Sequence, residues 1–165
     1  RLVLRTAVKA GLMGYYDRNI GQSTFERFQV GGDGITNFNL YGKDIIALRG
    51  YEETDVTYNP QTIEELDSEG NIVYGIDGKP QTRTVNVGDP FYAKYTIELR
   101  YLLTKPENQT TTLYALAFVE GGESWSTFKE FNPFDVKRTA GLGLRAYLPM
   151  FGTLGVDYGL SLIHI

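Results

Sequence analysis

Residues 91–103 read FYAKYTIELRYLL, and their side chains alternate between two faces. Apolar or aromatic residues occupy every odd position, whereas the even positions include Lys94, Thr96, Glu98 and Arg100. A period of two is the signature of a β-strand. Strands of globular proteins usually have about 5 to 6 residues, and a tilted membrane strand needs about 9 to 11. The stretch therefore predicts a strand that crosses a membrane.

The same alternation recurs in four other segments of the chain. The predicted strands are residues 2–15, 91–103, 111–121, 137–148 and 153–159. Their polar faces carry charged residues at mid-strand, such as Arg5 and Arg145, and their apolar faces carry aromatic residues toward the strand ends. Short turns alternate with long loops, as in outer-membrane barrels. The fold class expected is all-β, a fragment of a transmembrane antiparallel β-barrel, and a β-sandwich is the alternative.

Composition excludes several classes of protein. The 165 residues contain no cysteine, which removes disulfide frameworks and thiol chemistry. The net charge of −4 argues against nucleic acid as a partner, and no apolar run approaches the roughly 18 to 20 residues of a spanning helix. No catalytic triad is recognisable. We expect no enzyme activity, no cofactor and no metal site.

A loop of residues 16–89 separates the first two strands and is too long to lack structure of its own. Its second half is acidic, and turn signals around residues 71–76 predict a small exposed hairpin. Calcium binding there is a weak alternative, because the acids lack a fixed ligand spacing. Its first half is rich in glycine and aromatic residues, in the order Phe25, Glu26, Arg27, Phe28, Gly31, Gly32, Leu48, Arg49, Gly50 and Tyr51.

These loop residues resemble the sixth extracellular loop of BamA-type outer-membrane assembly factors. The insertion between Asp33 and Ala47 is similar to the Bacteroidota form, and the resemblance continues through residues 95–101, 116–125, 131–134 and 140–157. It implies strands eleven to fifteen of a sixteen-stranded barrel, the C-terminal part, with the periplasmic POTRA repeats upstream. Since the chain begins at Arg1 rather than Met, we expect a fragment. Five strands cannot close a barrel, so we expect it not to fold stably in isolation.

By this resemblance the loop folds back into the barrel lumen, where its arginine is held by acids on the barrel wall. The matching residues are Arg49 and, as its partners, Glu98 and Glu120. The period of two also places both glutamates on the polar faces of their strands. Leu48, Gly50 and Tyr51 complete this predicted latch.

The resemblance implies an insertase that folds β-barrel proteins and inserts them into the outer membrane of a Gram-negative bacterium. Its expected partners are outer-membrane lipid, unfolded outer-membrane proteins, periplasmic chaperones and accessory lipoproteins. A two-partner-secretion-type polypeptide transporter of the same superfamily is one alternative, and a porin or ligand-binding β-domain is another. About five periplasmic repeats upstream would favour the insertase, two the transporter and none the porin.

The last six residues, Leu160–Ile165, have a different explanation. They read LSLIHI, which the codons CTG TCT CTT ATA CAC ATC encode, and that string resembles the transposon end of sequencing-library adapters. We expect residues 160–165 to be a tail that is not native. His164, the single histidine, therefore carries no prediction of a site.

Overall fold

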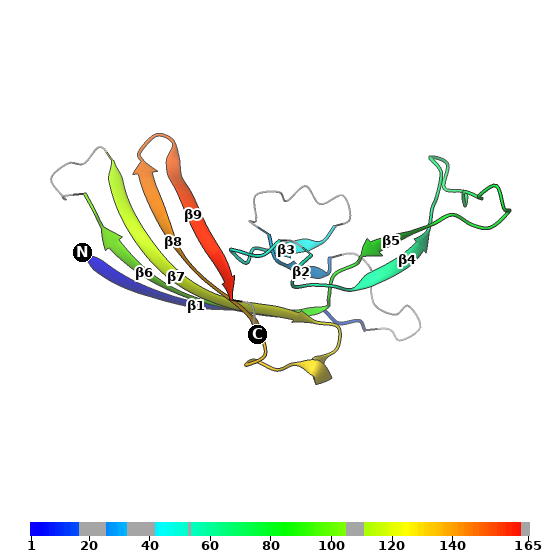
Figure 1. Cartoon of the computed structure of the whole chain (residues 1–165), viewed down its shortest axis with the longest axis horizontal. Helices are drawn as coiled ribbons and strands as arrows, with labels where there is room; N and C mark the ends of the chain where they lie inside the picture. Colours follow the sequence, from blue (N-terminus) through cyan, green and yellow to red (C-terminus); the bar gives the residue numbers. More distant parts are fainter. Residues whose placement is uncertain (17–25, 33–41, 53, 105–110, 163–165) are drawn as a thin grey trace.

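The computed structural model describes residues 1–16, 26–32, 42–52, 54–104 and 111–162. Its main element is an antiparallel sheet of five strands in the order β1-β6-β7-β8-β9 (Figure 1). The strands are β1 (Leu2–Leu12), β6 (Phe91–Leu102), β7 (Thr112–Trp125), β8 (Lys137–Leu148) and β9 (Gly152–Leu162). This is the all-β, antiparallel class that the alternation predicts. In the described ranges no helix is long and apolar enough to cross a membrane.

The two faces of the sheet differ as the period of two requires. Directly paired residues lie on the same face, so the row Leu4, Leu99, Ala117, Leu142 and Tyr158 faces outward. Most of these side chains are exposed. The next row, which includes Glu98 and Phe118, faces inward and is covered by the long loop. Within the described residues no second sheet covers the apolar face, which is contrary to a β-sandwich.

Two strands extend beyond their predicted ends. β7 continues from residue 121 to Trp125, because Gly121 and Gly122 keep their ladder pairing with β6. β9 continues from residue 159 to Leu162 and pairs with Arg138, Thr139 and Ala140. Residues 160–162 thus fit the sheet geometrically, while residues 163–165 lie outside the described part of the chain. That 160–165 is non-native stays a prediction about the underlying nucleotides.

The long loop contains two small sheets of its own. Strands β2 (Phe28–Val30) and β3 (Asp44–Ile46) pair in parallel and lie on the inward side of the main sheet (Figure 1). Strands β4 (Pro60–Glu64) and β5 (Thr82–Asn86) form an antiparallel hairpin that extends beyond the end of the sheet. The hairpin is larger than the one predicted around residues 71–76, because bridges such as Leu66–Ile72 prolong it toward its tip.

Candidate functional site

A small apolar core holds the segment that leads to Arg49. Leu48 follows β3 and is 0% exposed, in a cluster with Val30, Val56 and Tyr92. Its side chain lies above Gly122 of β7, where a Cβ would be 3.4 Å from Leu48 Cδ1. Because apolar burial fixes the residue before Arg49, the guanidinium starts from a defined position on the inward face.

Arg49 contacts three carboxylates that come from three strands. Its Nη2 donates to Glu120 Oε1 at 2.7 Å and to Glu98 Oε1 at 2.9 Å, and its Nη1 donates to Asp157 Oδ2 at 3.3 Å. The backbone N–H of Arg49 also donates to Glu120 Oε2 at 3.2 Å. Glu120 therefore fixes both the side chain and the backbone of the loop. A planar guanidinium with several donors suits such a site.

The three acids occupy consecutive inward rows of the sheet. Glu120 pairs with Thr96, Glu98 with Phe118 in the next row, and Asp157 lies in the row after that, opposite Gly143. Phe118 lies between the acids, and Arg49 Cζ is 3.6 Å from its ring centroid. This distance is short enough for a cation–π interaction. The guanidinium is thus bound at its edge by acids and at its face by an aromatic ring.

The sequence reasoning missed Asp157, Lys94 and Phe118 as members of this site. Lys94 Nζ lies 3.1 Å from Glu120 Oε1 and donates to the carbonyl of Ala47 in the loop. The period of two puts Asp157 on the polar face of the predicted strand 153–159, but it does not say where along that strand a residue meets the loop. Phe118 carries no charge, so only its position beside the two glutamates could have indicated it.

Further cations surround the same acids. Arg100 pairs with Glu98, Arg145 pairs with Asp157, and Arg5 Nη1 lies 3.5 Å from Glu98 Oε2. Arg100 and Arg145 had no role from the sequence. Arg100 donates to Glu98 Oε2, the oxygen that Arg49 does not contact, and Arg145 donates to both oxygens of Asp157, of which Arg49 contacts Oδ2. Each acid is then oriented from two sides, which limits the rotamers it can adopt.

The ionisation of Arg49 follows from this environment. Burial alone would lower the pKa of its guanidinium, but the hydrogen bonds and attraction of Glu120, Glu98 and Asp157 raise that pKa above its ordinary value. Arg49 is therefore charged at any pH at which the protein folds. The latch depends on the ionisation of the acids and not on that of the base.

Gly50 allows the loop backbone to touch the barrel wall. Its φ is 91°, a conformation that side chains with a Cβ rarely adopt. A Cβ there would lie 2.8 Å from Thr139 Oγ1 and 3.1 Å from the carbonyl carbon of Gly159. The loop and β9 approach each other through two glycines, which explains why the residue after Arg49 has no side chain.

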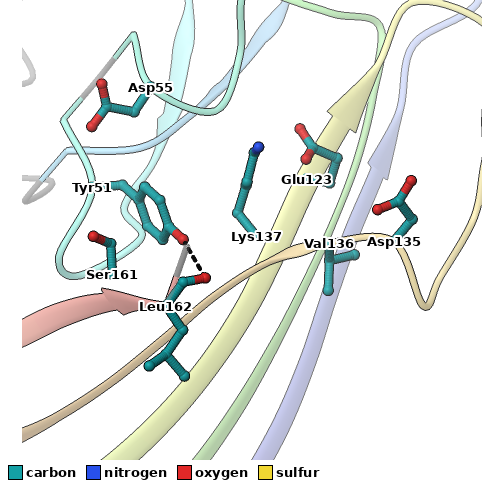
Figure 2. Close-up of a pocket in the computed structure, with 8 residues that line it drawn as sticks. All are labelled: Tyr51, Asp55, Glu123, Asp135, Val136, Lys137, Ser161 and Leu162. Atoms are coloured by element: carbon teal, nitrogen blue, oxygen red, sulfur yellow. Dashed lines mark hydrogen bonds between the residues drawn. The ribbon is translucent and has the colours of Figure 1, made fainter. Parts of the chain in front are cut away.

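Tyr51 closes the latch at the rim of the sheet. Its hydroxyl donates to the carbonyl oxygen of Arg138 at 2.9 Å, and the carbonyl oxygen of Leu162 is 3.4 Å away. Figure 2 shows the ring beside a pocket that is lined by residues including Asp55, Glu123 and Lys137. Burial raises the pKa of the Tyr51 phenol, which keeps the hydroxyl protonated as a donor.

The other predicted loop residues lie near the base of the latch. The ring of Phe28 packs tilted against that of Tyr92, with centroids 4.7 Å apart, and the Phe28 backbone exchanges hydrogen bonds of 2.8 Å with Asp89. Arg27 is buried and Glu26 has a φ of 64°. The N–H groups of Gly31 and Gly32 donate to Ile46 and Tyr51. Phe25, and residues 33–41 of the insertion, lie outside the described residues.

A second buried contact joins the loop to β7. Thr57 Oγ1 and Ser124 Oγ lie 2.6 Å apart, and the Ser124 hydroxyl donates to Asp89 Oδ2 at 2.7 Å. Asp89 also accepts hydrogen bonds from Ser126 at 2.8 Å and from the Asn59 amide at 3.0 Å. Thr57, Ser124 and Asp89 are all buried. The loop is thus fixed both at Arg49 and at this Asp89 network.

The site has the chemistry of a clamp. Arg49 and its acids form ion pairs, and the Asp89 network forms hydrogen bonds between side chains that burial shields from water. Among the described residues, no group of three or more His, Cys, Asp and Glu could hold a metal ion. These contacts can hold a long loop against the inward face of the curved sheet.

Comparison with protein families gives a match over nearly the whole chain. The sequence model of the Omp85 superfamily domain matches residues 1–164. No curated protein and no solved structure matches the chain.

Proposed function

This chain belongs to the Omp85 superfamily, and we propose that it forms the C-terminal part of the barrel of a BamA-type insertase. Proteins of this superfamily are outer-membrane proteins of Gram-negative bacteria or organelles, and they include both insertases and two-partner-secretion transporters. We place this chain in a Gram-negative outer membrane, in the Bacteroidota-like form of the insertase. Its role is to fold and insert β-barrel proteins without an enzymatic reaction.

One observation carries this choice: the long loop is bound to the wall at two separate places. Arg49 is held by Glu98, Glu120 and Asp157, and Thr57 is joined to Asp89 through Ser124. An insertase can keep its loop inside the lumen, because the substrate strand adds to an exposed strand edge by β-augmentation. A transporter that passes a polypeptide through the lumen must release the loop. Two independent contacts favour the first arrangement.

The proposed partners follow from the same mechanism. The exposed apolar face of the sheet fits outer-membrane lipid, and the substrates are unfolded outer-membrane proteins. Periplasmic chaperones that deliver them, and accessory lipoproteins, complete the assembly. Nucleic acid is not among the partners that we propose.

A disulfide across the Asp89 network separates insertase from transporter. The hydroxyl oxygens of Thr57 and Ser124 are 2.6 Å apart, so cysteine sulfurs at these positions would lie within reach of an S–S bond, and the 165 residues contain no native cysteine. The full-length protein with Thr57→Cys and Ser124→Cys is reconstituted in vesicles. The rate at which a β-barrel substrate folds is then measured with and without reductant.

We expect the oxidised double variant to fold substrate at the rate of the reduced form, because insertion leaves the loop in place. Each single cysteine variant is the matched control for the loss of the native hydrogen bond. If oxidation stops the activity and reductant restores it, the loop must move and the insertase proposal is wrong. Export of a soluble polypeptide under reducing conditions alone would instead identify a transporter.

A further inference from the structure

The connection between β7 and β8 packs on the outward face of the sheet, opposite the latch. Its short helix η1 (Phe128–Glu130), drawn in yellow, lies on the other side of the sheet from β2 and β3 (Figure 1). Phe131 meets Phe91 and Trp125 edge to face, with ring centroids 5.0 Å apart in both pairs. We call residues 126–136 the aromatic foot. The foot does not extend away from the barrel into water but packs on the outward face of the sheet.

The ladder register shows that the foot covers the apolar face. Phe91 of β6 pairs directly with Trp125 of β7, and both share their face with Ile97 and Val119, which are exposed. Phe91 and Trp125 themselves are buried, together with Ala93, under Phe131 and Val136. The foot therefore continues the outward apolar surface at the end of the sheet nearest the long loop.

The foot lies at the height of a membrane interface. Trp125 follows Leu113 by twelve residues along β7. At about 3.3 Å per residue and a strand tilt of about 45°, Trp125 stands about 28 Å above Leu113. The apolar band of an outer-membrane barrel is about 25 Å tall and ends in aromatic girdles. Trp and Tyr are enriched at this depth of a bilayer, where Trp125 lies.

Two rings of the foot remain largely exposed in the described structure. Phe128 is 65% exposed, although it stacks with Phe131 at 6.0 Å, and Phe134 is 81% exposed. A hollow lined by Leu12, Tyr15, Pro90 and Phe91 adjoins Phe128 and extends the apolar surface toward β1. Exposed apolar patches of this kind mark interaction sites.

We propose that the aromatic foot binds lipid of the outer leaflet, with Phe128 and Phe134 inserted at the interface between the acyl chains and the headgroups. Continuity with the outward face of the strands identifies lipid as the occupant, because that face meets lipid in an outer-membrane barrel. The proposal rests on membership of the Omp85 superfamily and not on the choice between insertase and transporter. It assigns the foot a role as an anchor that holds the rim of the sheet at a fixed depth.

Fluorescence quenching tests the depth of the foot. The full-length protein carries a single cysteine in place of Phe128, with any cysteine outside this chain replaced, and is labelled with an environment-sensitive dye in lipid nanodiscs. Quenching by lipids with a nitroxide near the headgroup is compared with quenching by aqueous iodide. Ile76→Cys, at a fully exposed position of the hairpin, is the control for water. Leu142→Cys, on the outward face of β8, is the control for lipid.

We expect lipid nitroxide to quench the label at residue 128 several-fold more strongly than the label at residue 76, and iodide to show the reverse order. Phe134→Cys provides a second position if the first variant folds poorly, and gel mobility of unheated samples checks folding. A label at 128 or 134 that behaves like the label at 76 overturns the proposal. Protection of the label from both quenchers would also overturn it and would indicate a protein in place of lipid.

Discussion

The latch depends mainly on Arg49, although Lys94 also joins Glu120 to the loop through the carbonyl of Ala47. Arg49 reaches acids on three strands, and its ring contact with Phe118 adds a fourth anchor. Its side chain is 15% exposed, while that of Glu120 is 2% exposed. An exposed ion pair contributes about 0 to 1 kcal/mol, and loss of one partner of a buried pair costs about 3 to 5 kcal/mol. We expect the free-energy cost of removing Arg49 to lie between these limits.

Replacement of Arg49 tests this dependence. In the full-length protein, Arg49→Ala should make the loop sensitive to protease and lower the level of outer-membrane proteins, while the barrel stays folded. Arg49→Lys keeps the charge but loses the planar fork, so we expect an intermediate effect. Limited proteolysis and immunoblots of outer-membrane fractions measure both. Unchanged protease resistance together with unchanged assembly in the Ala variant would contradict the latch.

The long loop keeps its shape through contacts between its two ends. Phe28, the first residue of β2, pairs with Asp89 near the end of the loop, and β3, which pairs with β2, leads to Leu48 and Arg49 of the latch. Asp89 accepts side-chain hydrogen bonds from Ser124, Ser126 and Asn59 while it is buried. An unsatisfied buried polar group costs about 1 to 3 kcal/mol. Asp89 therefore couples the closure of the loop to β7.

Asp89→Asn should loosen the base of the loop without releasing Arg49. In the variant, an amide NH₂ group replaces one of the two carboxylate oxygens of Asp89. The side chains that donate to that oxygen then face another donor, so at least one hydrogen bond is lost. Hydrogen exchange followed by mass spectrometry should show faster exchange in residues 54–59 and 86–90, with little change around residues 48–51. Glu69→Gln, at an exposed position of the hairpin, is the control. Equal exchange in the two variants would show that the Asp89 network contributes nothing to the loop.

The fit between loop and barrel wall depends on glycines in β8 and β9. Gly141 leaves room for the ring of Phe118, and Gly159 lies directly against the backbone of Arg49 and Gly50. A Cβ on Gly159 would stand 3.0 Å from the backbone nitrogen of Gly50 and 3.1 Å from the carbonyl carbon of Arg49. Both neighbours are backbone atoms, so they cannot rotate away. The curved sheet and the folded loop are complementary only without that side chain.

Gly159→Ala should therefore push the loop away from β9 and weaken the contact between Arg49 and Asp157. In the full-length protein we expect faster proteolysis of the loop than in the unmodified protein, with normal insertion of the barrel into the membrane. Gly14→Ala is the matched control, because a Cβ on Gly14 meets nothing within 4 Å. If Gly159→Ala leaves the loop as resistant as Gly14→Ala does, the close approach of the two backbones has no influence on the latch.

Local pattern was sufficient to predict the strands and the faces of their residues. The period of two in residues 91–103 put Glu98 on the polar face, and the alternation in the predicted strand 2–15, of which β1 covers residues 2–12, did the same for Arg5. Side-chain direction in a strand depends only on neighbouring backbone geometry, which the order of residues reveals. The strand ends at residues 121 and 159 were placed too early, because pairing with a neighbouring strand continues where alternation has stopped.

Which inward residues meet one another was decided only by the tertiary structure. Arg49 and Asp157 are 108 positions apart, and their contact needs the register of four paired strands as well as the return of the loop onto them. The Asp89 network and the aromatic foot likewise join segments that no local period relates. Register is set by ladder hydrogen bonds and by packing between distant segments. The sequence alone therefore determined which residues share a face of the sheet. Only the tertiary structure placed three of the inward carboxylates around one guanidinium.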